Sequence, residues 1–188
     1  MKKLIKTNEE KVFKTIRMEG VKVSYSDEEG NHVLTHTIIK SNPSIAIIVK
    51  KEGKIALIKQ FRSSTGETYI EIPAGIINDG ENEIDAAIRE TQEETGYLIN
   101  NVSIIVKGPS LLDPSKSNEN YGVAVGDVWG QSERMLDETE EIDSEIIWMD
   151  EKEVFERVKA QMYKGEFFKD NLFMTGHSLY AIMAYMLV

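Results

Sequence analysis

The fold and chemistry of this chain depend most on Gly75-Ile-Ile-Asn-Asp-Gly-Glu81 and, seven residues later, Arg89-Glu90-Thr91-Gln92-Glu93-Glu94-Thr95-Gly96. On a helix, glutamates at positions i, i+3 and i+4 project from one face within a single turn, so Glu90, Glu93 and Glu94 would repel one another if unpaired. A cluster of carboxylate oxygens suits a hard divalent cation such as Mg²⁺, which commonly recruits phosphate oxygens. The stretch therefore predicts diphosphate chemistry.

The same stretch predicts the bounds of its own helix, residues 83–95. Asn82 is expected to be the N-cap, and Gly96 is expected to end the helix. At about 100° of rotation per residue, the side chains of a packing face gather roughly 120° away from the glutamates. The expected members of that face are Ile84, Ala87, Ile88, Thr91 and Thr95. Arg89 lies beside the carboxylates and is expected to pair with Glu81.

Composition narrows the class of protein. The chain has 188 residues, no cysteine and a formal net charge of −10. The length suits one domain of ordinary size, and the missing cysteines exclude disulfides and thiolate metal sites. The negative charge argues against sequence-independent binding to nucleic acid, which relies on Lys and Arg. Because the sequence has neither a signal peptide nor a long apolar run, no membrane span and a cytoplasmic location are expected.

The order of strands and helices predicts a mixed α/β sandwich. Two β-hairpins are expected, from residues 21–25 with 33–39 and from residues 44–49 with 54–59. Further strands are expected at residues 68–72, 102–106, 122–128 and 145–148, and further helices at residues 152–162 and 178–188. Without βαβ alternation, a doubly wound sheet is not expected. The boundary at Ser41-Asn-Pro43 separates an N-terminal antiparallel β-element, residues 1–42, from a main domain, residues 43–188.

The opening stretch resembles the signature box of the Nudix hydrolases, which reads Gly, five residues, Glu, seven residues, Arg-Glu-apolar-any-Glu-Glu-any-Gly-apolar. The matching residues are Gly75, Glu81, Arg89, Glu90, Glu93, Glu94 and Gly96. One position departs, because Thr91 replaces the usual aliphatic residue, although its methyl group can still pack. The resemblance implies a Nudix-type α/β/α sandwich with a mixed β-sheet and hydrolysis that depends on Mg²⁺ or Mn²⁺.

The resemblance also implies roles for the residues of the box. The implied metal ligands are Glu90, Glu93, Glu94 and the backbone carbonyl of Ala74, and Glu93 is counted among the catalytic groups as well. Water would attack one phosphorus while the metals hold the diphosphate and lower the pKa of that water. Gly75, Glu81 and Arg89 would support the ligands from behind.

Two elements before the box are similar to those of ADP-ribose and ADP-sugar pyrophosphatases: Gln60-Phe-Arg62 and Glu71-Ile-Pro-Ala-Gly75. By this likeness Arg62 and Glu71 are substrate-binding residues. Arg62 would present a forked set of donors to the diphosphate, which lysine cannot match in geometry. Taken alone, Arg62 is equally well explained as a surface arginine at a strand end.

The loop Asp113-Pro-Ser-Lys-Ser-Asn-Glu119 is similar to a substrate loop of the same subfamily. Pro114 would fix the backbone of the loop, and Glu119 would reach the metal or the terminal ribose. Ser115 replaces the usual glycine, which is costly if that position needs a positive φ. An ordinary surface turn is the alternative.

The acidic segment Leu136-Asp-Glu138-Thr-Glu140-Glu141 aligns with the loop that carries the catalytic base in ADP-ribose enzymes. A base must come within hydrogen-bond reach of the attacking water. Glu138 takes the base position, and Glu140 is the close second candidate.

The histidines and several aromatic residues indicate less about function. His32, His36 and His177 have no spacing typical of a ligand pair or a triad and are expected to be structural. Trp129 and Trp148 are expected in the core, and adenine would stack on aromatic residues of the N-terminal element such as Phe13 or Tyr25.

The function that follows is hydrolysis of ADP-ribose, or of a related nucleoside diphosphate sugar, to a nucleoside monophosphate and a sugar phosphate. A homodimer that exchanges the N-terminal β-element is expected. GDP-mannose, or another nucleoside diphosphate derivative, is the alternative substrate. A ligand sensor with a Nudix-like domain is a further alternative, but such regulators usually carry a DNA-binding appendage and a damaged box.

Overall fold

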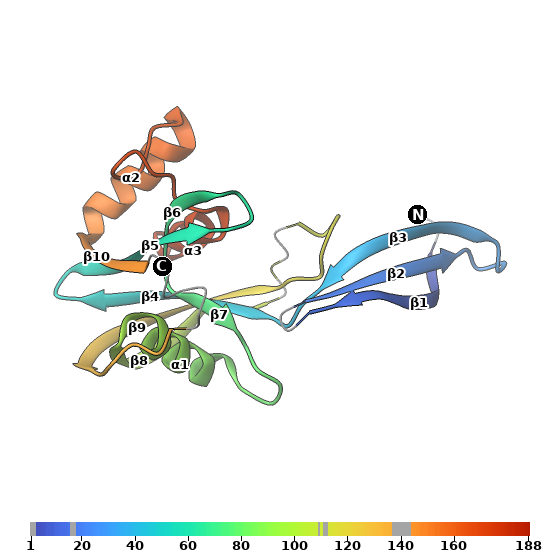
Figure 1. Cartoon of the computed structure of the whole chain (residues 1–188), viewed down its shortest axis with the longest axis horizontal. Coiled ribbons are helices and arrows are strands. Elements are labelled where there is room, and N and C mark those ends of the chain that lie inside the picture. The colour runs from blue at the N-terminus through green and yellow to red at the C-terminus, as the bar shows by residue number, and fades with distance from the viewer. Residues whose placement is uncertain (1–2, 16–17, 109, 111–112, 137–143) are drawn as a thin grey trace.

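The computed structural model describes residues 3–15, 18–108, 110, 113–136 and 144–188. Its strands are β1 (Ile5–Lys14), β2 (Glu19–Ser26), β3 (His32–Lys40), β4 (Ser44–Lys51), β5 (Lys54–Arg62), β6 (Glu67–Glu71), β7 (Ala74–Ile76), β8 (Tyr97–Val106), β9 (Tyr121–Gln131) and β10 (Ser144–Asp150). Its helices are α1 (Glu83–Thr95), α2 (Glu151–Lys164) and α3 (Gly176–Tyr185). Figure 1 shows a layered body from which a three-stranded sheet projects to one side.

The body is built on a mixed sheet in the order β10-β5-β4-β9-β8, with β6 beside β5 and β7 beside β4. β4 pairs with β9 in parallel, and the other pairings of this sheet are antiparallel. The sheet is therefore mixed, as the sequence predicts, and α1 lies on the opposite face from α2 and α3 (Figure 1).

The alternation of side chains along the buried strand β4 explains the two helical layers, because successive residues of a strand point to opposite faces. Ile45, Ile47 and Val49 pack in one core cluster with Ala86 and Ala87 of α1. On the other face, the core cluster contains Ala46 and Ile48 together with Val154, Val158, Ala181 and Ile182 of α2 and α3. A strand that is apolar at every position is buried on both sides, and this produces the α/β/α sandwich.

Helix α1 has the predicted bounds and caps. The Asn82 side chain accepts hydrogen bonds from the backbone N–H groups of Ile84 and Asp85, and Gly96 ends the helix at φ 71°. The prediction of the packing face is wrong at Ile84, which is 42% exposed. Ala86, which the helical-wheel argument omitted, is fully buried instead.

The N-terminal sheet, in the order β1-β2-β3, confirms the predicted hairpin of β2 and β3 and adds the strand β1, which the sequence analysis missed. It is joined to the body by the loop before β9. The N–H of Ile39 donates to the carbonyl of Lys116 at 2.8 Å, and the N–H of Asn118 donates to the carbonyl of Ile39 at 3.2 Å. The loop that contains Pro114 is thereby fixed between the sheet and the body.

The two tryptophans differ in burial. Trp129 on β9 is 64% exposed, so the prediction that it lies in the core is wrong. Trp148 packs edge-on against Tyr97 with ring centroids 5.2 Å apart. Within the described ranges, no helix combines the length and the apolar character that a membrane span requires.

Candidate active site

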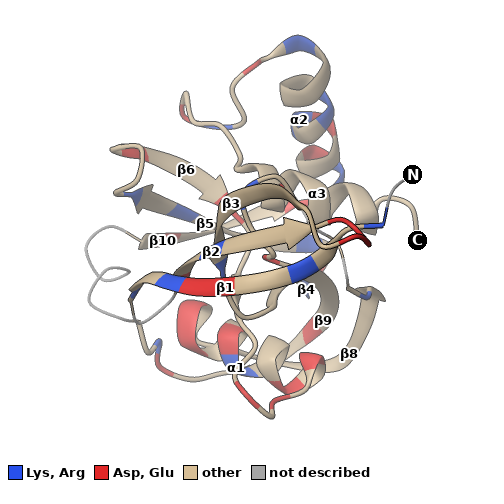
Figure 2. Cartoon of the chain, turned by 90° about the vertical axis from the view of Figure 1, so that its right-hand side faces the viewer, with Lys and Arg blue, Asp and Glu red and all other residues tan. Residues whose placement is uncertain are grey.

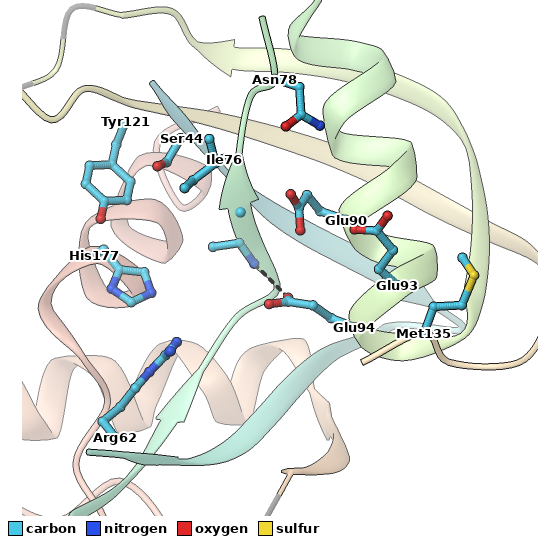
Figure 3. Close-up of a pocket in the computed structure, with 12 residues that line it drawn as sticks. Ser44, Arg62, Ile76, Asn78, Glu90, Glu93, Glu94, Tyr121, Met135 and His177 are labelled. Carbon is cyan, nitrogen blue, oxygen red and sulfur yellow. Dashed lines mark hydrogen bonds between the residues drawn. The ribbon is translucent and has the colours of Figure 1, made fainter. Parts of the chain in front are cut away.

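A cavity of about 330 Å³ lies over the short strand β7, between α1 and the N-terminal end of α3. Figure 3 shows Glu90, Glu93 and Glu94 on one side of the strand and Arg62, Tyr121 and His177 on the other. We call these sides the α1 wall and the facing wall. The acidic residues of α1 are also visible as a group in Figure 2.

Arg89 organises the α1 wall. Its Nε and Nη2 donate to the two carboxylate oxygens of Glu81, each at 2.8 Å, and Nη2 also donates to the carbonyl of Ile76. Its Nη1 donates to Glu90 at 2.6 Å and to Glu93 at 2.9 Å. One guanidinium thus connects the loop before the helix to two of the three predicted ligands, and the expected pairing with Glu81 is present.

The charge of Arg89 lowers the pKa of Glu81. Hydrogen bonds from Arg89, reinforced by the backbone N–H of Asn78, lower the pKa of Glu81 to about 2. The same carboxylates raise the pKa of Arg89, with Glu81 as the largest cause. The pair therefore stays fully charged at neutral pH.

Gly75 is required by close approach rather than by an unusual backbone conformation. A Cβ atom at this position would lie 1.9 Å from Cδ of Glu90 and about as close to both of its carboxylate oxygens. No side chain could occupy that space while Glu90 keeps its place. The box glycine therefore makes room for the carboxylate on the neighbouring helix.

Glu94 is fixed from the floor of the cavity. Its Oε2 accepts a hydrogen bond from the backbone N–H of Ala74 at 2.9 Å, drawn as the dashed line in Figure 3, and the residue is 7% exposed. Ala74 also lines the cavity, so its peptide lies against this carboxylate.

The α1 wall fits a hard divalent cation in its chemistry. Its side chains Glu90, Glu93 and Glu94 offer carboxylate oxygens, the kind of ligand that Mg²⁺ and Mn²⁺ prefer. Nη1 of Arg89 already sits within hydrogen-bond distance of both Glu90 and Glu93, so a positive charge is accommodated between them. Among the described residues, no three His, Cys, Asp or Glu side chains are arranged as a ready metal site.

The facing wall starts from a buried ion pair. Nε of Arg62 donates to Oε1 of Glu71 at 2.8 Å, and Nη2 donates to Oε2 of the same carboxylate. The Glu71 side chain is 2% exposed, whereas that of Arg62 is 39% exposed and lines the cavity. Glu71 therefore fixes the plane of the guanidinium, and only Arg62 of this pair is well exposed.

His177 and Tyr121 complete the facing wall, and the sequence analysis missed both as site residues. Nε2 of His177 lies 3.6 Å from Oε2 of Glu71, and its ring stacks on Tyr121 with centroids 5.9 Å apart and planes at 14°. Burial is the largest cause of a lowered pKa of His177. The histidine follows β6 by a long stretch of chain, so no local spacing could have indicated this contact.

The loop 113–119 reaches the cavity through Tyr121. The Tyr121 hydroxyl donates to Glu119 at 2.7 Å, and burial followed by Glu119 raises the pKa of that hydroxyl. Among the described residues, positive φ angles of non-glycine residues occur at Glu52, Asn101, Asp170 and Asn171, so Ser115 causes no such strain. The loop that carries Pro114 instead contacts the N-terminal sheet, where a ring nitrogen of His36 lies 3.0 Å from the carbonyl oxygen of Ser115.

Glu138 and Glu140, the two candidates for the base, lie outside the described residues. The described residues on either side of that segment are fixed beside α1. The N–H of Met135 donates to the carbonyl of Glu93 at 2.9 Å. Nε of Arg134 donates to the carbonyl of Glu94 at 2.7 Å, and its Nη1 donates to the carbonyl of Ser144 at 3.0 Å.

Comparison with known proteins identifies the fold family. The model described as NUDIX domain matches residues 40–170, well over half of the chain. The chain belongs to the Nudix family. Its Nudix box is therefore the stretch from Gly75 to Gly96, with α1 as the box helix. At the departing position, Thr91 is fully buried and its hydroxyl donates to the carbonyl of Ala87 at 2.7 Å.

Relatives of this Nudix chain include an ADP-ribose pyrophosphatase of Bacillus subtilis (strain 168), 38% identical over 80 residues that cover 40% of this chain and 43% of the relative. An ADP-ribose pyrophosphatase of Saccharomyces cerevisiae is 36% identical over 112 residues, which cover 53% and 47%. The chain thus spans about half the length of these curated relatives. A crystal structure of an ADP compounds hydrolase aligns with a TM-score of 0.76 at 16% identity, covering 100% of this chain and 94% of that one. That likeness concerns the fold.

Proposed function

We propose that this Nudix protein hydrolyses the diphosphate of ADP-ribose, or of a related nucleoside diphosphate sugar, to a nucleoside monophosphate and a sugar phosphate. The observation that carries the proposal is the opposition of two walls across one cavity. Carboxylates of α1 lie on one side of β7, and the Arg62 guanidinium lies on the other. The activity of relatives named ADP-ribose pyrophosphatase supports the same substrate class.

In this proposal a diphosphate lies between the walls. Glu90, Glu93, Glu94 and the carbonyl of Ala74 would hold Mg²⁺ or Mn²⁺, which would neutralise phosphate charge and lower the pKa of the attacking water. Arg62 donates to phosphate oxygens, with Glu71 holding its guanidinium in plane. Arg89, braced by Glu81, maintains the spacing of Glu90 and Glu93.

Glu138 remains our candidate for the general base, with Glu140 as the second candidate. The contacts of Met135 and Arg134 with the carbonyls of Glu93 and Glu94 support this assignment, because the acidic segment then starts beside the carboxylate helix. Glu119, which accepts a hydrogen bond from the Tyr121 hydroxyl, would reach the metal or the terminal ribose, and Pro114 would fix the backbone of its loop, which contacts the N-terminal sheet through Ser115.

We also propose that residues 1–42 form the dimer interface. Apolar side chains exposed on this element support the proposal: Leu4, Ile5, Val12, Phe13, Met18, Val33 and Leu34 are each at least 37% exposed. A surface of this kind is typical of an interface. Sedimentation velocity should give a dimer for the native chain and a monomer for the double variant Val12→Glu, Val33→Glu. A dimer in both would overturn this placement of the interface.

A panel of nucleoside diphosphate sugars, assayed with Mg²⁺ and with Mn²⁺, tests the function. We expect turnover of ADP-ribose to AMP and ribose 5-phosphate, identified by mass spectrometry. Preference for GDP-mannose would keep the reaction and change the nucleoside. No turnover of any member of the panel with either metal would overturn the proposed function.

A further inference from the structure

His177 lies at a position that the proposed reaction does not yet use. It is the second residue of α3, and its side chain is 19% exposed and lines the cavity. The start of α3 is fastened to β6, because the N–H of Ile72 donates to the buried hydroxyl of Ser178 at 3.1 Å and the N–H of Thr175 donates to the carbonyl of Ile70 at 3.2 Å. The imidazole is therefore held beside Glu71 by backbone structure.

The groups near His177 that can carry charge come from β5, β6 and the residues at the start of β9. Glu71 of β6 is nearest, at 3.6 Å from Nε2, which is too long for a hydrogen bond with a neutral ring but close enough for an ion pair. Arg62 of β5 bonds the same carboxylate. Glu119, before β9, bonds the hydroxyl of Tyr121, whose ring stacks on the imidazole.

The charge of this wall depends on His177. Arg62 and Glu71 cancel each other when the imidazole is neutral, so an entering dianionic diphosphate meets little net positive charge. Protonation of His177 adds one positive charge at the cavity, which offsets the negative charge of Glu71 and Glu119 around Arg62. Protonation also gives Glu71 a second partner, which lets Arg62 turn toward a phosphate without abandoning a buried carboxylate.

We propose that His177 is a positioning residue of the facing wall, which takes up one proton from solvent as the diphosphate binds and pairs with Glu71, so that Arg62 can engage the phosphates. This inference rests on the proposed function. The proton adds to the free ring nitrogen and leaves both nitrogens as N–H donors. Burial lowers the pKa of His177 in the free protein, Arg62 lowers it further, and Glu71 and Glu119 oppose these effects.

Linkage fixes the sign of the pH dependence. If the diphosphate raises the pKa of His177, a lower pH must strengthen binding by the same amount. Each unit of that rise corresponds to about a tenfold gain in affinity as the pH falls through the window between the free and bound pKa values. Above the bound pKa the gain disappears.

Calorimetry with the α,β-methylene analogue of ADP-ribose and Mg²⁺ tests the inference, because this analogue cannot be cleaved at the bridging atom. Titrations at pH 7 in two buffers of different ionisation enthalpy measure the protons taken up. We expect uptake by the wild-type protein and little uptake by His177→Gln. His32→Gln is the matched control, because His32 lies in the N-terminal sheet and its ring nitrogen lies 2.9 Å from the Thr35 hydroxyl. That control should behave as wild type.

The pH dependence of KM distinguishes the proposed role of His177 from a purely structural one. His177→Gln should raise the KM for ADP-ribose about tenfold at pH 6, with a KM near that of the wild-type protein at pH 8. NMR of the histidine rings in the unsubstituted protein should show one pKa that rises when the analogue binds, which covers the case of a variant that does not fold.

The outcomes separate the two proposals. An analogue that does not bind the wild-type protein would overturn the proposed function and this inference with it. Binding with equal proton uptake in wild type and His177→Gln, or with no histidine pKa rising in the NMR titration, would overturn the role of His177 alone.

Discussion

The two walls of the cavity differ in how far apart in the chain their residues lie. The α1 wall takes its carboxylates from one helical turn and its brace, Arg89, from the preceding residue of the same helix. The facing wall takes Arg62 from β5, Glu71 from β6, Tyr121 from β9 and His177 from α3. The first wall is therefore set by local spacing, and the second exists only once the sheet and α3 have assembled.

This difference has an energetic side. The carboxylates of the α1 wall repel one another, and the guanidinium of Arg89 offsets part of that repulsion. A metal cation bound there would offset it further. The facing wall is a nearly neutral set in which a buried carboxylate is compensated by Arg62. Substitutions on the two walls should therefore fail in different ways.

The largest effect is expected from Glu93→Gln, which removes the charge of a proposed metal ligand. Mutation of a residue that only supports a metal ligand typically lowers metal affinity or activity about 10- to 100-fold. Loss of a ligand itself should therefore lower kcat/KM for ADP-ribose at least about a hundredfold. Initial rates across a Mg²⁺ titration measure it. Glu83→Gln, in the first turn of the same helix, should remain near wild type. Equal losses in both variants would mean that general helix charge, rather than the site, is responsible.

Gly75→Ala tests whether the α1 wall depends on close approach. Since the new Cβ would lie 1.9 Å from Cδ of Glu90, the carboxylate must move. Activity should fall about tenfold to a hundredfold, and overpacking should cost about 1–3 kcal/mol of stability, measured by urea denaturation. At Gly176 a Cβ would meet nothing within 4 Å, so Gly176→Ala is the matched control. A fully active Gly75→Ala would refute the close-approach argument.

Arg62→Lys should have an intermediate effect that falls on KM. Lysine cannot make the two parallel hydrogen bonds to Glu71, so both its position and its forked donation to phosphate are lost. We expect a rise in KM of about tenfold, or about 1.4 kcal/mol. Arg157→Lys on α2 replaces an exposed arginine that pairs with Glu153, and it should change nothing. An unchanged KM for Arg62→Lys would remove Arg62 from the substrate site.

The smallest effects concern acid stability, and they separate the walls by pH window. The pKa of Glu81 is about 2 in the folded protein against an ordinary value of 4.5, so its stabilisation is present above pH 4.5 and is lost as the pH falls toward 2. The pKa of His177 lies below its ordinary 6.5, so stability is already lost as the pH falls below 6.5. Denaturation curves of wild type, Glu81→Gln and His177→Gln should be measured at several pH values. Glu81→Gln should lose the pH dependence of stability between pH 4.5 and 2, and His177→Gln should lose the pH dependence below pH 6.5. If both variants lost pH-dependent stability over the same pH range, the attribution of the two ranges to Glu81 and His177 would be wrong.

The sequence predicted α1 to the residue because its caps and its periodicity are local signals. Asn82 satisfies the first N–H groups, and Gly96 adopts the left-handed conformation that ends the helix. Ile84 was misplaced because a helical wheel cannot tell which apolar neighbour the sheet will cover. β1 was missed because its ten residues are all exposed and mostly polar, so it carries no pattern of burial.

The candidate site likewise contains some residues that the sequence indicated and others that it did not. Glu81, Arg89 and the three glutamates were found from helical spacing together with the resemblance to the Nudix box, whereas His177 was judged structural because nothing near it in the chain suggests Glu71 as its neighbour. Tyr121 was not singled out at all, because the predicted strand began at residue 122 and nothing in its local sequence pointed to the cavity. Both contacts arise where β6, β9 and α3 meet, and such meetings depend on packing that no short window of sequence encodes.

By itself, the sequence determined the bounds of the box helix and the grouping of Glu90, Glu93 and Glu94 on one of its faces. These follow from helical geometry, capping and charge, which act over a few residues. Only the tertiary structure decided what faces those carboxylates, because the facing wall joins strands and a helix that are distant in the chain. The physical reason is that a buried charge such as Glu71 is tolerated only where folding brings it its partners, and Arg62 and His177 become neighbours only in the folded protein.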